Sequence, residues 1–312
     1  MATIGHKSAP ATKAHTLERA RHRASLVPDL LVDARRIANT VMAGWHGRRR
    51  RGIGESFWQY RPYQPGETLA RIDWRRSARD DHTYVRDLEW EAAHTVWIWV
   101  DLSPSMLFRS NGARTSKEER ALIIAIAMAD LLSSAGERIG YPGLLRPRSS
   151  RSGAERLATA LIGSDVEQAP DWPDLSMVRR YSEMLVISDF LRPMDECSTF
   201  LDEIGRHGAR PHLVEIADPA EEDFPYRGRT EFLDPESGQR ITSGRAQDWV
   251  EEYRTLRRAR RATLRQRTQS LAGSYTVSRT DQLASETLVR LHGMLTGNPE
   301  EVASLAAPEV SA

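Results

Sequence analysis

Residues 96–105 read Val-Trp-Ile-Trp-Val-Asp-Leu-Ser-Pro-Ser and join a strongly apolar half to a polar half. The first five residues are all β-branched or aromatic, which is typical of a central strand buried on both faces. The polar half begins at Asp101, where we predict that the strand ends. The run Met184-Leu-Val-Ile187 has the same character and is followed by Ser188 and Asp189. We therefore predict two buried strands, each of which ends near an aspartate.

Helices and strands are predicted to alternate along most of the chain. Helices are expected at residues 117–134, 154–162, 195–207, 248–271 and 281–295. Further strands are expected at residues 138–145, 211–216 and 275–278, and a hairpin at 232–241. This alternation predicts an α/β fold of Rossmann-like type, with a mostly parallel sheet and helices on both faces.

The same pattern divides the chain into four parts. Residues 1–24 and 297–312 lack apolar periodicity, so we predict two disordered tails. Residues 25–92 form an N-terminal segment, which begins with a helix over about 26–43 and continues into the basic tract Arg48–Arg51. Residues 93–296 carry the alternating pattern and are predicted to form the main domain.

The composition of the 312 residues is that of an ordinary globular protein. With 44 basic and 43 acidic residues the net charge is +1, which by itself gives no case for nucleic acid or an anionic membrane. Cys197 is the single cysteine, so a reducing compartment fits. The longest apolar run, 121–132, is interrupted by Asp130 and is shorter than the roughly 20 residues of a membrane span. With a polar N-terminus, these features predict a cytoplasmic protein without a membrane span.

Asp101, Ser103 and Ser105 alternate along the turn that follows the first buried strand. Because ligands bind beyond the carboxyl ends of the strands in parallel α/β sheets, we expect Asp189 to lie across from them. Carboxylate and hydroxyl oxygens are hard ligands that suit Mg²⁺ or Mn²⁺. Such an ion keeps a position open for a partner's carboxylate, which is adhesion chemistry and not catalysis. The alternative is that Asp101 and Ser103 only cap the next helix or shape the loop.

Four segments precede the first buried strand and have a distinctive pattern. They are Gly52-Ile-Gly-Glu-Ser-Phe57, Tyr60-Arg-Pro-Tyr-Gln-Pro-Gly-Glu67, Arg71-Ile-Asp-Trp-Arg-Arg-Ser-Ala-Arg79 and Tyr84-Val-Arg-Asp-Leu-Glu89. With Asp101, Ser103 and Ser105, with Ser188 and Asp189, and with Leu233-Asp-Pro-Glu-Ser-Gly238, they resemble the bacterial family called domain of unknown function 58. The resemblance covers nearly everything from residue 30 to residue 296.

This resemblance implies a von Willebrand factor A-like domain with a metal-ion-dependent adhesion site. It also implies a MoxR-type AAA+ ATPase and other von Willebrand factor A-like proteins as partners. The usual ion site of that fold takes a threonine from a loop between the two aspartate strands. Residues 146–153 offer serines but no threonine, so the sequence departs from the pattern at that ligand.

The segment around residues 73–79 places charge beside an aromatic side chain. Asp73, Trp74, Arg75 and Arg79 form a candidate docking surface for a partner. In the structural alternative, Asp73 pairs with an arginine and Trp74 packs against the sheet, which would fix the N-terminal segment to the main domain.

Two arginine-rich tracts support a different function, the binding of nucleic acid or an anionic surface. They are Arg48–Arg51 and the arginines of the helix 248–271. The helix begins with acidic residues and ends with basic ones, which complements its dipole and favours a solvated face instead. We find no phosphate-binding loop, zinc-protease motif or Gly-x-Ser-x-Gly elbow in the sequence. We therefore expect a non-catalytic binding protein, with a metal-dependent phosphoesterase as a minor alternative.

Overall fold

The computed structural model describes residues 25, 28–42, 57–63, 72–79, 82–88, 94–163 and 171–295. The predicted tails and the tract Arg48–Arg51 lie outside these residues. The chain divides into two compact units, one made of Trp45–Ala93 and one made of the remaining chain on either side. The later boundary lies next to the one expected at residue 93. The helix over residues 28–42 belongs to the larger unit, because it buries Leu30 and Ala34 there.

The larger unit is built on a six-stranded sheet in the order β10-β7-β6-β3-β4-β5. The strands are β3 (Thr95–Val100), β4 (Arg138–Tyr141), β5 (Leu145–Ser149), β6 (Glu183–Ser188), β7 (Arg210–Ala217) and β10 (Ser274–Arg279). Neighbouring strands are parallel except β4 and β5. The predicted α/β class with a mostly parallel sheet is confirmed.

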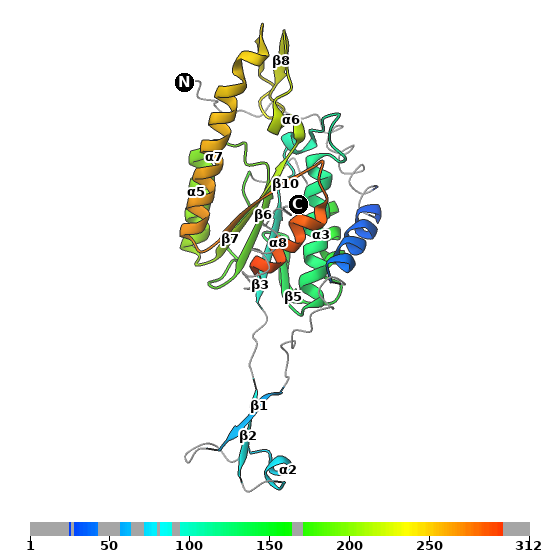
Figure 1. Cartoon of the computed structure of the whole chain (residues 1–312), viewed down its shortest axis with the longest axis vertical. Helices are drawn as coiled ribbons and strands as arrows, with labels where there is room; N and C mark the ends of the chain where they lie inside the picture. The colour runs from blue at the N-terminus through cyan, green and yellow to red at the C-terminus, as the bar shows by residue number, and fades with distance from the viewer. Residues whose placement is uncertain are drawn as a thin grey trace, which may run out of the picture. The chain divides into compact units, whose positions relative to one another are not determined.

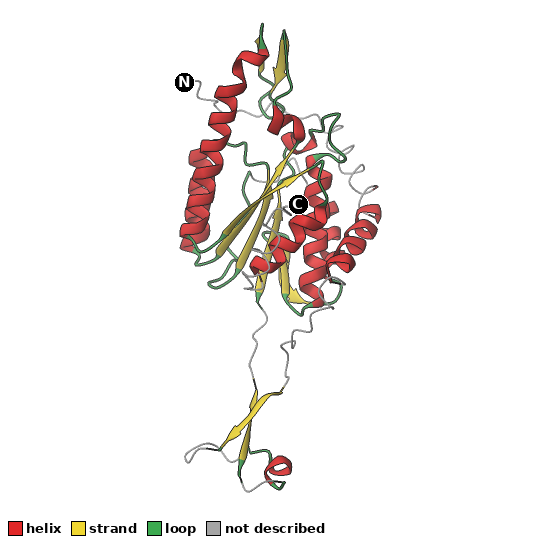
Figure 2. Cartoon of the chain, viewed as in Figure 1, coloured by secondary structure: helices red, strands yellow, loops and turns green. Residues whose placement is uncertain are grey.

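Helices cover both faces of this sheet (Figures 1 and 2). One face carries α3 (Lys117–Ser134), α4 (Gly153–Gly163) and α8 (Ala284–Leu295), and the other carries α5 (Met194–Arg206) and α7 (Val250–Ser270). Helix α3 lies between the sheet and two other helices, so it is buried on nearly every side. It begins with a capping box in which Ser116 and Glu119 each accept the other's backbone N–H.

The predicted strand 138–145 is in fact a hairpin. Strand β4 ends at Tyr141, and β5 returns antiparallel from Leu145 as the edge strand. The turn contains Pro142 and Gly143, and Gly143 has a φ of +77°. Proline and glycine are strong turn residues, and here they outweigh the apolar run around them.

A second hairpin, the predicted one at 232–241, pairs β8 (Thr230–Leu233) with β9 (Arg240–Ser243). It follows the short helix α6 (Pro219–Asp223) and precedes the 3₁₀ turn η3 (Ala246–Trp249). The Phe232 ring stacks on Phe224 and on Trp249, with ring centroids 5.8 Å apart in both pairs. This aromatic cluster attaches the hairpin to its neighbours in the chain.

The smaller unit contains the antiparallel strands β1 (Phe57–Pro62) and β2 (Tyr84–Leu88) and the short helix α2 (Trp74–Ser77). The Asp73 carboxylate caps α2 by accepting the backbone N–H groups of Arg75 and Arg76 at 3.1 and 3.0 Å. Across both units, the described helices include none that is long and apolar enough to cross a membrane.

The strand order places a candidate ligand site between β3 and β6. From β3 the chain moves to β4 on one side and then returns to β6 on the other side. This reversal is a topological switch point, and open α/β sheets bind ligands outside the carboxyl ends of the strands at such points. Asp101 and Asp189 follow these two strand ends.

Candidate functional site

The sheet brings Asp101 and Asp189 together. Strands β3 and β6 are parallel neighbours with Val100 opposite Ile187, and the Asp101 N–H extends the ladder by donating to the Ile187 carbonyl at 2.8 Å. The Asp101 and Asp189 side chains are both buried. Two carboxylates without water around them need compensating donors or cations.

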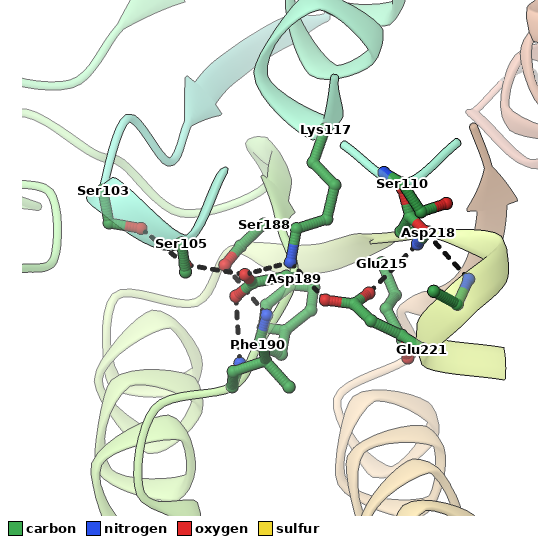
Figure 3. A network of polar contacts seen from close by, with 12 residues as sticks. Ser103, Ser105, Ser110, Lys117, Ser188, Asp189, Phe190, Glu215, Asp218 and Glu221 are labelled. Atoms are coloured by element: carbon green, nitrogen blue, oxygen red, sulfur yellow. Dashed lines mark hydrogen bonds and ion pairs between the residues drawn. The ribbon is translucent and has the colours of Figure 1, made fainter. Parts of the chain in front are cut away.

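Hydrogen bonds join the four predicted site residues into one network, and Figure 3 shows the part of it that contains Ser103, Ser105 and Asp189. The Ser103 N–H donates to Asp101 Oδ1 at 2.9 Å, and the hydroxyls of Ser103 and Ser105 lie 3.2 Å apart. The Ser105 hydroxyl donates to Asp189 Oδ2 at 2.7 Å. A fifth residue, Ser188, donates its hydroxyl to Asp101 Oδ2 at 2.6 Å. The alternating pattern Asp101, Ser103, Ser105 is therefore one side of a buried polar centre.

A lysine completes this centre. Lys117 is the first residue of α3, and its side chain is only 1% exposed. Its ammonium lies 2.8 Å from Asp189 Oδ2 and 2.6 Å from Glu221 Oε1 on α6. Figure 3 shows it reaching down between these two carboxylates. On its remaining side the Phe108 ring lies 5.9 Å away, measured to the ring centroid.

The protonation states follow from these contacts. Burial alone would lower the pKa of Lys117, but Asp189 and Glu221 raise it above its ordinary value. Burial would raise the pKa of Asp189, yet Lys117 and the Ser105 hydroxyl hold it below its usual range. Burial and the charge of Asp189 raise the pKa of Asp101. The centre therefore holds a charged Lys117–Asp189 pair beside a carboxyl group whose charge is disfavoured.

The donor chemistry suits a hard cation, but the arrangement does not accommodate one. Asp189 Oδ2 already receives the Ser105 hydroxyl and the Lys117 ammonium. A divalent ion on that oxygen would have to displace the ammonium, because two cations in direct contact with one buried oxygen repel each other strongly. Among the described residues there is also no group of three or more His, Cys, Asp or Glu side chains that could hold a metal ion. The predicted donors are close together, but the Lys117 ammonium already binds one of them, Asp189.

The loop after β6 is held in an unusual conformation. Phe190 has a φ of +51°, in the left-handed region that a phenylalanine rarely adopts. The Phe190 N–H donates to the Ser188 hydroxyl at 3.0 Å, and the Leu191 N–H donates to Asp189 Oδ1 at 3.1 Å. The Arg260 guanidinium on α7 donates to the Phe190 carbonyl at 2.6 Å. Strained backbone conformations that several contacts hold in place are common beside functional sites.

The β8–β9 hairpin also reaches the centre. Glu236, in the stretch Leu233–Gly238, accepts the Ser105 N–H at 2.9 Å. Its loop is ordered by Asp234, whose carboxylate accepts the Glu236 N–H at 3.0 Å. The stretch that resembled the family thus has a physical role, because it presents a carboxylate to the turn that carries Ser105.

The structure shows the local surroundings of the four predicted docking residues. Asp73, Trp74, Arg75 and Arg79 belong to the smaller unit. Asp73 caps α2, whereas Trp74 is 64% exposed, and Arg75 and Arg79 are exposed too. Whether these residues form a docking surface or anchor the segment to the larger unit stays a prediction.

Helix α7 engages several of its arginines inside the protein. Arg257 and Arg261 bind the buried Glu215 and the partly buried Glu222, with the closest Arg257 contacts at 3.0 and 2.9 Å. Arg260 holds the loop after β6, as described above. These three arginines are committed to internal contacts, which weakens the case for α7 as a nucleic-acid surface.

Sequence reasoning missed Lys117, Glu221 and Glu236. Lys117 carried a signal, since a cation in the first turn of a helix opposes the helix dipole. Glu236 lay in a stretch that was noticed only for its resemblance. No sequence feature indicated Glu221, because it lies 104 residues after Lys117 and only the fold brings the two together.

The comparisons with known proteins agree with the resemblance noted in the sequence. Residues 59–263 match the family described as protein of unknown function DUF58, and the chain belongs to this family. The uncharacterized protein Rv1480 of Mycobacterium tuberculosis and the uncharacterized protein Mb1516 of Mycobacterium bovis are each 30% identical to it over 213 residues. That match covers 64% of this chain and 66% of each relative, which is just under two thirds of their length.

Two solved structures show weaker similarity. They are the conserved hypothetical protein BatB from Bacteroides thetaiotaomicron and an aerotolerance-related membrane protein from Bacteroides fragilis. The first is 12% identical, covers 69% of this chain and 99% of its own, and has a TM-score of 0.35. The second is 14% identical, covers 68% of this chain and 100% of its own, and has a TM-score of 0.38. Similarity at this level assigns neither a fold nor a function.

Proposed function

We propose that this protein is a non-catalytic binding scaffold with a von Willebrand factor A-like domain, and that its partner is a MoxR-type AAA+ ATPase. The partner would contact the carboxyl edge of the sheet around Asp101, Ser105 and Asp189. The observation that carries the proposal is a buried, fully connected polar network at the point where the strand order reverses. Other von Willebrand factor A-like proteins are candidate members of the same assembly.

The surroundings of the network favour binding. Leu107 and Phe108 follow Ser105 and are 42% and 39% exposed, and Leu191 follows the Asp189 loop and is 49% exposed. Exposed apolar side chains around a polar centre are common at protein interfaces. A partner that covers them would gain apolar burial on loops that the buried polar network holds in place.

The chemistry of the network favours binding over hydrolysis. The nearest base to the Ser105 hydroxyl is Asp189, whose pKa is held low by Lys117. A carboxylate of low pKa is a weak base and activates a serine poorly. Burial raises the pKa of the Cys197 thiol to about 11, so this side chain is also a poor nucleophile at neutral pH.

The expectation of Mg²⁺ or Mn²⁺ at this site stays a prediction. The proposed contact with the partner does not require an ion, because Lys117 already supplies a positive charge beside Asp189. The proposal therefore rests on the shape and polarity of the edge, and its test includes a chelator.

The test is an affinity capture from native lysate with quantitative mass spectrometry. The bait is the wild-type chain in Mg²⁺, the wild-type chain in chelator, and the variants Asp101→Asn and Arg258→Ala. Arg258 is an exposed α7 arginine that bonds only within its own helix in the described contacts, so it serves as the matched control. We expect wild type and Arg258→Ala to recover an AAA+ ATPase in similar amounts. Asp101→Asn should recover at least about tenfold less of it.

Each other outcome is informative. Absence of any AAA+ ATPase from the wild-type capture would contradict the partnership. Equal recovery with Asp101→Asn would move the interface away from this edge. Salt-sensitive capture of nucleic acid that is indifferent to Asp101→Asn would support the arginine-tract alternative instead.

A further inference from the structure

The choice of lysine at position 117 is unusual for this chain. The sequence has 44 lysine and arginine residues, and only three of them are lysines, at positions 7, 13 and 117. Lys7 and Lys13 lie outside the described residues, so every other basic Lys or Arg position of the described chain is an arginine. An ammonium is a compact point charge, whereas a guanidinium is a wide planar fork. Position 117 therefore holds the one described side chain that resembles a small cation.

The position is costly for helix α3 and for burial. Lys117 is the first residue of the helix, where the helix dipole disfavours a positive charge. Its side chain is 1% exposed, so nearly all its hydration is lost. A buried ion pair is a weak source of net stability. These costs argue that the ammonium serves the centre and not the helix.

The surroundings of the ammonium are those of a bound cation. Asp189 Oδ2 and Glu221 Oε1 approach it at 2.8 and 2.6 Å from two different segments, the loop after β6 and the helix α6. Ser105 donates to the same Asp189 oxygen and is joined to Ser103. Of the residues that the sequence assigned to a divalent ion, Asp189 thus contacts a charge that belongs to the chain itself, and Ser105 bonds to the same carboxylate oxygen.

We infer that Lys117 is the tethered cation of this site, which replaces a divalent metal ion and makes the centre independent of Mg²⁺ and Mn²⁺. The inference concerns the site used in the proposed function, but it requires no partner, so either idea can fail without the other. Removing the lysine side chain should leave Asp189, Glu221 and Ser105 as a vacant oxygen site. The spacing left by an ammonium is closer to Ca²⁺–oxygen distances of about 2.3–2.6 Å than to the shorter ones of Mg²⁺.

The test measures ion binding by the full-length chain and by Lys117→Ala. Mn²⁺ binding is followed by electron paramagnetic resonance of the free ion, and Ca²⁺ binding by calorimetry. Thermal unfolding is recorded with and without each ion. The double variant Lys117→Ala/Asp189→Asn is the matched control, because it lacks the carboxylate that would hold the ion.

The expected result has two parts. The wild-type chain binds neither ion at this site, and its Tm does not change. Lys117→Ala has a lower Tm without metal, binds about one Ca²⁺ or Mn²⁺ per chain, and gains roughly 5–10 °C at a free ion concentration about a hundred times Kd. The double variant loses that gain.

Two results would overturn the inference. One is wild-type binding of Mn²⁺ or Ca²⁺ that Asp189→Asn abolishes, because the lysine would then not stand in for the ion. The other is a folded Lys117→Ala that binds neither ion. If Lys117→Ala does not fold without metal, folding on addition of either ion supports the inference. Failure to fold with both ions, when the double variant does fold, contradicts it.

Discussion

The buried centre at the carboxyl edge and the buried ionic network under α7 are built differently. On the α7 face, Arg257 and Arg261 bind Glu215 and Glu222, so two cations face two carboxylates in multiple short contacts. At the carboxyl edge of β3 and β6, the one Lys117 ammonium is shared by Asp189 and Glu221. Asp101 lies beside them with a hydroxyl and a backbone N–H as its hydrogen-bond donors.

The pKa shifts express this difference. Burial would raise the pKa of Glu222, but Arg261 and Arg257 hold it below its usual range. Burial and Asp189 raise the pKa of Asp101. The α7 network is therefore balanced and acts as a structural lock between α7 and the sheet. The edge network retains an electrostatic cost, and perturbed pKa values of this kind are common at functional sites.

The largest expected effect comes from removing the shared cation. Lys117→Met should destabilise the protein by about 3–5 kcal/mol, because it leaves Asp189 buried without its ammonium. Lys117→Met/Asp189→Asn should recover part of this loss, since it removes the uncompensated charge. Urea unfolding at neutral pH in the presence of chelator measures both. A loss below about 1 kcal/mol in the single variant would mean that the pair is not as buried as described.

A smaller effect is expected in the α7 lock. Arg261→Ala should cost about 2 kcal/mol, because Arg257 remains to neutralise part of the charge of Glu215 and Glu222. Arg258→Ala on the exposed side of the same helix should stay within about 0.5 kcal/mol of wild type. The two variants are compared by urea unfolding. Equal losses of unfolding free energy in the two variants would show that the α7 arginines are interchangeable surface charges. The α7 network would then not be a structural contrast to the centre at the carboxyl edge.

The smallest effect on stability is expected at Asp101. Asp101→Asn should change the free energy of unfolding at pH 7 by no more than about 1 kcal/mol, because relief of the repulsion from Asp189 offsets the weaker hydrogen bond from Ser188. Chemical denaturation measures it, with Asp189→Asn as the contrasting variant. A loss at Asp101 as large as that at Asp189 would show that both carboxylates are structural.

The two strands that carry the site, and the aspartates at their ends, could be predicted from the sequence. The apolar run of β3 and the run before Ser188 are buried strands whatever surrounds them, so the two aspartates had to appear at strand ends. Their meeting followed from the parallel alternation of helices and strands. The predicted strand at 138–145 was wrong in its second half, because the Pro142–Gly143 turn outweighed the apolar run.

The sequence by itself determined most of the elements and the four donors Asp101, Ser103, Ser105 and Asp189, because burial and turn chemistry are local properties of a segment. Only the tertiary structure decided which charge these donors face. Lys117 precedes Asp189 by 72 residues and Glu221 by 104, and no local pattern encodes a contact over such distances. The sheet order and the placement of α3 and α6 bring them together. For that reason a lysine ammonium contacts Asp189, one of the four donors that the sequence assigned to a metal ion.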